Sequence, residues 1–139
     1  ALLLQAGKGR PQNYQQELFW AWSAFLGGIE PAEELSEDLK NLLPEDSLKV
    51  TREKLIETLQ DRIDAGDRSA LMELALFYKE ISEEPNFEEA YLWYSIASAF
   101  LLDGAIFARD EAAGKVETKS MVELQERAGT IFEKLSSVK

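Results

Sequence analysis

Residues 86–100 read NFEEAYLWYSIASAF, and this stretch decides the fold that the sequence predicts. Apolar and small residues recur every three or four positions along it, which is the period of an α-helix. Asn86 stands directly before the periodic run, and Glu89 follows three residues later. Asparagine is a preferred helix N-cap, and an acidic or amide side chain three residues on can bond back to the cap's own amide. The stretch therefore predicts a helix that begins near Phe87.

The same pattern occurs 73 residues earlier, where residues 13–27 read NYQQELFWAWSAFLG. When the sequence is displaced by that interval, its two halves align without a gap. The shared motif consists of Asn13, Tyr14, Trp20 and Ala24 in the first copy and Asn86, Phe87, Ala90, Trp93, Tyr94 and Ala97 in the second. The alignment predicts two related units, residues 1–66 and 67–139, in one continuous array.

Helix-forming residues dominate the chain, and glycine or proline separates its periodic segments. These segments predict helices at about 14–27, 31–42, 47–64, 68–80, 87–102, 104–115 and 119–136, with the end of a further helix at 1–6. We expect an all-α fold, a right-handed α-α superhelix (solenoid) of antiparallel helix pairs. Each repeat would bury its tryptophan, tyrosine, leucine and alanine face against its neighbours.

Two stretches resemble the Sel-one-like repeat (SLR) family, whose short helix–turn–helix units are related to tetratricopeptide repeats (TPR). They are GKGRPQNYQQELFWAWSAFLGGIEPA at 7–32 and GDRSALMELALFYKEISEEPNFEEAYLWYSIASAF at 66–100. In the second, the residues that carry the resemblance are Ala70, Leu74, Tyr78, Asn86, Phe87, Ala90, Trp93, Tyr94, Ala97 and Ser98. The stretch ARDEAAGKVETKSMVELQERA at 108–128 looks like the closing helix pair of bacterial SLR proteins. The resemblance implies a binding surface for a peptide or another protein.

The chain also departs from the SLR pattern. Glu17 stands where the family has a small residue, and Phe25 stands where the second copy has Ser98. The loop KEISEEPN at 79–86 contains no glycine. In the first copy, residues 1–6 match only the end of the helix predicted at 68–80, so its first helix is truncated. We therefore expect the chain to be cut from a longer protein or matured by cleavage.

The amino-acid composition excludes several kinds of catalytic and metal site and several classes of partner. The chain has neither cysteine nor histidine, which excludes serine–histidine and cysteine–histidine nucleophile pairs and zinc sites built from those residues. The net charge of −11 disfavours nucleic acid and anionic membranes and favours a basic partner. No apolar run approaches the roughly 20 residues of a membrane helix. We expect no membrane insertion and no cofactor, and the compartment, bacterial cytoplasm or periplasm, stays open.

The glycine-rich stretch QAGKGRPQNYQQ at 5–16 raises the question of a phosphate site. A P-loop places its lysine after the second glycine and follows it with serine or threonine, whereas Lys8 lies between Gly7 and Gly9. We interpret the stretch as a connection between helices. The equivalent stretch of the second copy, YKEISEEPNFEE at 78–89, keeps the asparagine and the aromatic residue but has no glycine.

The tryptophans are candidates both for the core and for contacts with a partner. Trp20 and Trp93 recur in register, so we expect both to pack in the core between repeats. Trp22 lies about 200° from Trp20 around a helix, which leaves two alternatives, an exposed or groove-lining anchor and burial under the closing helix. Candidate partner-binding residues are Trp22, Arg68, Met72 and Glu73.

The acidic runs at 33–38 and 83–89 are typical of solvated helix faces, and Arg109–Asp110 suggests a structural ion pair or a helix-to-helix hydrogen bond. The function that these patterns favour is a protein–protein interaction or scaffold module without catalysis of its own. Two alternatives stay open, a structural self-associating module and a carboxylate-based hydrolase.

Overall fold

The structure is a computed structural model that describes residues 11–137, with side chains described from Tyr14 onward. Its elements are α2 (Pro11–Leu26), α3 (Pro31–Lys40), α4 (Glu45–Asp64), α5 (Ser69–Leu76), the π-helix η1 (Phe77–Ile81), α6 (Phe87–Ala99), α7 (Ala105–Ala113) and α8 (Thr118–Ser136). The predicted all-α class is confirmed, because this described part of the chain contains no strand. The superhelical arrangement stays a prediction.

The predicted helix end at 1–6 and the glycine stretch with Lys8 lie outside the described residues. Within residues 11–137, no helix is both long and apolar enough to cross a lipid bilayer.

The two asparagines of the repeat motif occupy different helix positions. Asn86 is the N-cap of α6, and its side-chain oxygen accepts a hydrogen bond from the Glu89 amide at 3.1 Å. The return bond of a capping box is absent from this cap, because the Asn86 amide donates to the Tyr78 carbonyl and the Glu89 carboxylate accepts from Arg127. The repeat motif predicts that Asn13 is the N-cap of the equivalent helix, and this prediction is wrong, since α2 begins at Pro11, two residues earlier. Proline suits the first helical position because it has no amide hydrogen to leave unpaired.

The chain divides into two compact units, Ala1–Glu57 and Thr58–Lys139, and α4 passes from one into the other. In the first unit α2 packs against α3. The Gln15 side chain of α2 donates to the Ser47 carbonyl of α4 at 3.4 Å. The buried side chains of this unit include Leu18, Phe19, Ala21, Trp22 and Leu26 from α2, Ala32 and Leu39 from α3, and Leu48 and Leu55 from α4.

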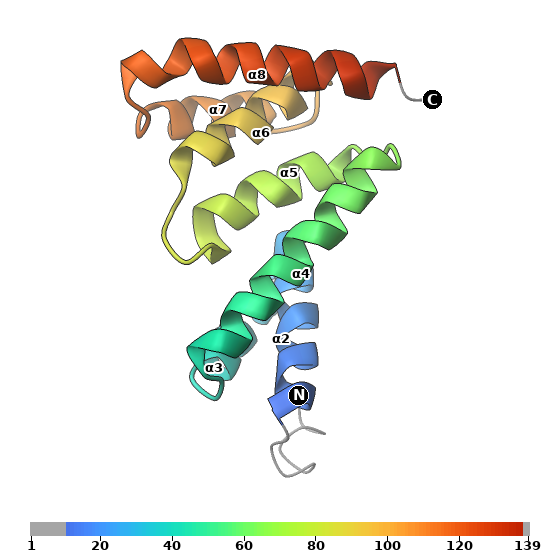
Figure 1. The fold of residues 1–139 in the computed structure, drawn as a ribbon, viewed down its shortest axis with the longest axis vertical. Helices are drawn as coiled ribbons and strands as arrows, with labels where there is room; N and C mark the ends of the chain where they lie inside the picture. Colours follow the sequence, from blue (N-terminus) through green and yellow to red (C-terminus); the bar gives the residue numbers. More distant parts are fainter. Residues whose placement is uncertain (1–10, 138–139) are drawn as a thin grey trace. The chain divides into compact units, whose positions relative to one another are not determined.

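In the second unit α6 is the central helix, and it packs against α5, α7 and α8 (Figure 1). Its buried residues lie on all sides, which is typical of a helix surrounded by others. Arg109 of α7 donates to the Ser98 hydroxyl of α6 and also pairs with its neighbour Asp110, which confirms both structural roles expected of it. Gln125 of α8 donates to the Tyr91 hydroxyl at 3.3 Å.

The helices of the two repeat copies, residues 1–66 and 67–139, correspond when the sequence is displaced by 73 residues. Three pairs match, namely α2 with α6, α3 with α7, and α4 with α8, and their ends agree to within about three residues. The helix α5 and the π-helix η1 have no such counterpart, because their equivalent positions end at residue 8, before the described part begins.

The corresponding helices α2 and α6 also end in the same way but with different residues. In the first unit Gly28 has φ of 97°, and the Ile29 amide donates to the Ala24 carbonyl. In the second unit the equivalent residue is Leu101, which has φ of 64° and is 84% exposed. Both are Schellman motifs, which require a left-handed residue that glycine adopts without strain. Leucine in that conformation costs about 1–2 kcal/mol.

We predict that Leu101→Gly stabilises the protein by about 0.5–1 kcal/mol, because it relieves the left-handed strain while adding unfolded-state freedom. The matched reverse change, Gly28→Ala, should destabilise by about 1 kcal/mol. A Cβ at Gly28 meets nothing within 4 Å, so this cost comes from the backbone alone. Urea unfolding at pH 7 measures both changes, with Leu101→Ala as the control that keeps a Cβ. A loss of stability in Leu101→Gly would contradict the assignment.

Candidate binding site: an acidic pocket beside a π-helical turn

The structure reverses the roles expected of the two neighbouring tryptophans. Trp22, a candidate partner-binding residue, is 3% exposed, and the Arg52 guanidinium lies 5.6 Å from the centroid of its ring. Trp20, expected in the core, is 61% exposed. The reason lies in the helix period, because Trp22 shares the face of Leu18 and Leu26 that packs inward, whereas Trp20 lies about 200° from it. Burial of Trp22, the second alternative, is therefore confirmed, and its role as an exposed anchor is wrong.

The other candidate partner-binding residues are engaged within the second unit. The Arg68 guanidinium lies 4.0 Å from the centroid of the Phe100 ring and donates to the Leu135 carbonyl. Glu73 accepts two hydrogen bonds from Arg62, at 3.0 and 2.8 Å. Met72 is half-buried. These contacts hold α5 against its neighbours, and nothing in them points to a partner.

Arg62, near the end of α4, bridges two carboxylates. Besides Glu73 it donates to Asp67 at 2.9 Å. The hydrogen bond to Glu73, followed by that to Asp67, raises the pKa of Arg62. The hydroxyl of Ser69 donates to Asp67 at 2.6 Å, and this bond, followed by the one from Arg62, holds the pKa of the Asp67 carboxyl below its usual range. The turn between α4 and α5 is thus fixed by an ionised aspartate.

The motif residues of the second copy behave largely as core residues. Ala90 and Ala97 are fully buried, and Trp93 and Tyr94 are nearly so. Burial, with the charges of Glu80 and Glu111 adding to it, raises the pKa of Tyr94 to about 12. The prediction of a packed face is confirmed for this copy. Phe87, like the first-copy residues Tyr14 and Ala24, is half-buried.

A π-helical turn replaces the glycine that the loop at 79–86 lacks. The widened turn η1 ends with the Ser82 amide donating to the Phe77 carbonyl, five residues back. The Ser82 hydroxyl contacts the carbonyls of both Tyr78 and Glu84 at hydrogen-bond distance. Since the backbone reverses through these bonds, no left-handed residue is needed there. Turns of this kind are frequent at functional sites.

This turn forms one wall of a pocket of about 510 Å³ in the second unit. The pocket is lined by Tyr78, Ser82, Glu83, Glu84, Pro85, Asn86, Phe87, Glu88 and Lys115. Three glutamates thus line the pocket together with an aromatic ring and a proline. Burial, then the charge of Glu89, raises the pKa of Tyr78, so this phenol stays protonated at neutral pH.

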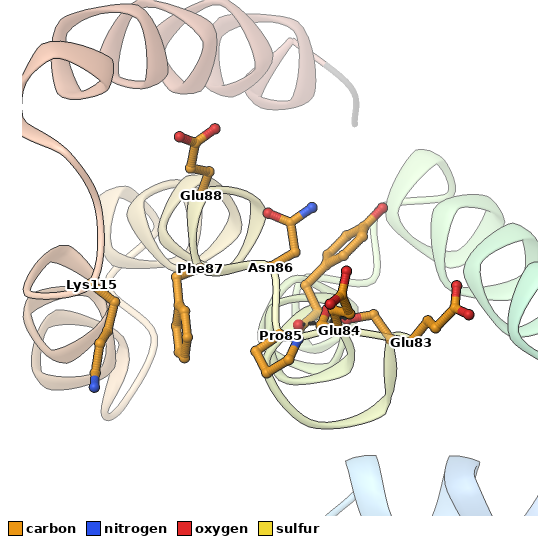
Figure 2. Close-up of a pocket in the computed structure, with 9 residues that line it drawn as sticks. Glu83, Glu84, Pro85, Asn86, Phe87, Glu88 and Lys115 are labelled. Atoms are coloured by element: carbon orange, nitrogen blue, oxygen red, sulfur yellow. Dashed lines mark hydrogen bonds between the residues drawn. The ribbon is translucent and has the colours of Figure 1, made fainter.

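Lys115 brings a cation to the aromatic part of the pocket. Its ammonium lies 5.9 Å from the centroid of the Phe87 ring, a cation–π distance. Figure 2 shows the two side chains running alongside each other, while Glu83, Glu84 and Glu88 point in different directions. Consistent with that divergence, the described residues contain no group of carboxylates placed to hold a metal ion. The pocket therefore presents a spread negative charge instead of a single ion site.

Sequence reasoning found the acidic run of this pocket but not the pocket itself. Glu83, Glu84 and Glu88 were interpreted as a solvated face, and each is exposed. The hollow depends on the π-helical turn and on Lys115, which is distant in the sequence. The missing glycine in the loop was the one available signal of an unusual turn.

Comparison with protein-family models, with curated protein sequences and with solved structures found no match. No family assignment follows, and the resemblance to Sel-one-like repeats stays a prediction.

The Arg62–Asp67 turn gives a pH-dependent prediction. The folded-state pKa of Asp67 is lowered, so its ionised carboxylate stabilises the fold fully at pH values above its unfolded-state pKa of about 3.9. This stabilisation is lost as the pH falls from there through the folded-state pKa. Asp67→Asn should therefore be less stable than wild type at pH 7, with a constant difference down to about pH 4 that shrinks below it.

Urea midpoints measured from pH 7 to pH 3 test this. Asp38→Asn, which removes an exposed carboxylate of α3, controls for the change in net charge. A difference between wild type and Asp67→Asn that grows on acidification would contradict the assignment.

Proposed function

We propose that the protein is a protein–protein interaction module that binds a basic peptide segment of its partner at the pocket beside η1. One observation carries the proposal: the pocket that Glu83, Glu84 and Glu88 line also contains the Lys115 ammonium, 5.9 Å from the centroid of the Phe87 ring. A lysine or arginine of a partner could take an equivalent place, with its stem on Phe87 and Pro85 and its charge toward these glutamates. The net charge of −11 would speed the approach of such a partner.

The divergent carboxylates favour a peptide over a single cation. Glu83 and Glu84 precede the start of α6 and Glu88 lies in its first turn, so the three charges are distributed along several residues of chain. A peptide with two or three basic side chains can face them in turn. Exposed ion pairs contribute about 0.2–1 kcal/mol each, so a partner would need several of them together with the aromatic contact.

A second candidate function is self-association through an apolar surface in the same unit. Leu101, Ile106 and Phe107 are 84%, 55% and 69% exposed. The equivalent residues in the first unit are Gly28, Glu33 and Glu34, so this apolar character belongs to the second unit alone. Large exposed apolar side chains that gather on one surface often mark interfaces, and these three are close together in the sequence. No described residue supplies an observation that favours the carboxylate-hydrolase alternative.

A labelled octapeptide of alternating lysine and alanine tests the pocket. We predict saturable binding, measured by fluorescence anisotropy, that weakens about tenfold in Glu83→Gln/Glu84→Gln/Glu88→Gln because three attractive charges are lost. Phe87→Leu should weaken it about two- to fivefold, because it keeps apolar volume but removes the ring face.

The matched control is Glu33→Gln/Glu34→Gln/Glu37→Gln on α3, which removes the same charge from a different surface. It should change the dissociation constant by less than about twofold. Equal weakening by both triple variants would show that net charge alone attracts the peptide, and the pocket proposal would fail.

A further inference from the structure

The acidic pocket also carries one positive charge. Of its lining residues Lys115 alone is a cation, and its side chain is exposed. In the view of Figure 2, Phe87 and Pro85 lie between Lys115 and the loop carboxylates Glu83 and Glu84. The pocket therefore has a cationic end and an anionic end, with an apolar part between them.

The charge of Lys115 is not neutralised within the described part of the chain. Two other lysines of the second unit, Lys79 and Lys119, lie 3.9 and 3.6 Å from carboxylate oxygens. Among the described side chains, residues 14–137, no carboxylate lies at ion-pair distance from the Lys115 ammonium. Residues 1–13 and 138–139, whose side chains are not described, contain no aspartate or glutamate. In this structure Lys115 is therefore open to a carboxylate of a bound molecule.

The turn that carries Lys115 does not require a lysine. Lys115 follows the C-cap of α7, and its amide donates to the Ala112 carbonyl at 2.9 Å. At the equivalent place after α3 the residue is Leu42, whose amide donates to the Leu39 carbonyl at 3.0 Å. Leu42 is 55% exposed, so neither copy uses this side chain to fill a core. The same backbone turn forms with leucine or with lysine, and the ammonium of Lys115 is available to the pocket.

Phe87 keeps this ammonium at the cationic end. The distance of 5.9 Å to the ring centroid is close to the limit of about 6 Å for a cation–π contact. An ammonium has three N–H donors, and none of those of Lys115 is bonded to a described oxygen at salt-bridge distance. A carboxylate of a bound segment can therefore accept a hydrogen bond from Lys115 while the lysine stays beside the ring.

We infer that Lys115 determines the order of charges in the segment that the pocket binds. Lysine or arginine of that segment faces Glu83 and Glu84, and an aspartate or glutamate of the same segment pairs with Lys115. The inference rests on the proposed function and narrows the partner from a basic segment to one that carries both signs of charge in this order. A segment that is basic throughout places a cation beside Lys115 and is repelled there.

Such a residue has a clear use on an acidic protein. The net charge of −11 attracts every basic chain, whatever the order of its residues. The repulsion at Lys115 opposes segments that carry positive charge alone, and pairing with a carboxylate removes that repulsion. Lys115 thus discriminates among basic segments that the net charge would attract to a similar degree.

The test pairs one carboxylate of a peptide with one ammonium of the whole chain. The octapeptide of alternating lysine and alanine is made with blocked ends, and its first or its last lysine is replaced by glutamate or, as the reference, by glutamine. The two placements allow for either chain direction in the pocket. Fluorescence anisotropy gives the glutamate preference, which is the dissociation constant of the glutamine version divided by that of the glutamate version.

In at least one placement this preference should be about threefold lower in Lys115→Gln than in wild type, because exposed ion pairs change a dissociation constant by about 1.5- to fivefold. Lys115→Glu should lower the preference further and should bind the all-lysine peptide about threefold more tightly than wild type does. Lys115→Leu, which copies the turn at Leu42, serves as a second neutral variant if Lys115→Gln does not fold.

Lys119→Gln is the matched control. It removes a lysine four residues further along the chain that does not line the pocket. The glutamate preference of this variant should stay within about 1.5-fold of wild type, because the effect of a solvent-exposed charge is screened by salt.

The outcomes that would overturn the inference bear differently on the proposed function. A preference that is the same in wild type and Lys115→Gln, with the all-lysine peptide still bound, would remove the role of Lys115 and leave the proposed function intact. The same would follow if the preference fell equally in Lys115→Gln and Lys119→Gln, since a general effect of charge would then explain it. No saturable binding of any of the peptides up to about 1 mM would contradict both proposals.

Discussion

The second unit depends on the burial of α6 by three surrounding helices. Ala90, Leu92, Ile96 and Ala97 have no exposed surface, and they lie on different sides of the helix. Alanines at two of these positions let a neighbouring helix approach closely, and the larger side chains fill the space on the other faces. Because the apolar residues of α6 surround its axis, the helix is stable only while all three neighbours are in place.

The first unit exposes a helix face whose equivalent is buried in the second unit. The equivalent helix α2 buries Leu18, Trp22 and Leu26 against its own unit, and its remaining face carries Trp20 and Glu17. The two helices thus share their place in the repeat and their C-terminal geometry but differ in length, 16 residues against 13, and in the number of buried sides. The second unit therefore provides an internal reference for the first, and the exposed tryptophan is the clearest departure from it.

The periodicity of small and apolar residues was enough to place the helices. The start of α6 at Phe87 followed from the cap chemistry of Asn86, and the correspondence of α4 with α8 followed from the repeat. Which tryptophan faces the core did not follow, because Trp20 and Trp22 are both apolar and a period alone does not say where the neighbours lie. Recurrence in register was a misleading guide at Trp20, since equivalent residues are buried equally only if the same helices surround them.

The candidate sites were less accessible to sequence reasoning. Arg68 and Glu73 looked like exposed contact residues because their partners, Phe100 and Arg62, come from other helices. The acidic pocket requires a π-helical turn, which depends on a local hydrogen-bond pattern that residue types did not indicate. Leu101 in a left-handed conformation is a similar case, since only the alignment with Gly28 could have suggested it.

Equivalent tryptophans of the two related units have opposite environments, exposed at Trp20 and buried at Trp93. Acrylamide quenching of three variants, each of which keeps one tryptophan and replaces the other two with phenylalanine, tests it most directly. Trp20 should be quenched several times faster than Trp22 or Trp93, because its ring is 61% exposed while theirs are 3% and 6% exposed. Quenching of Trp20 as slow as that of Trp93 would contradict the account, because both copies of the helix would then be covered.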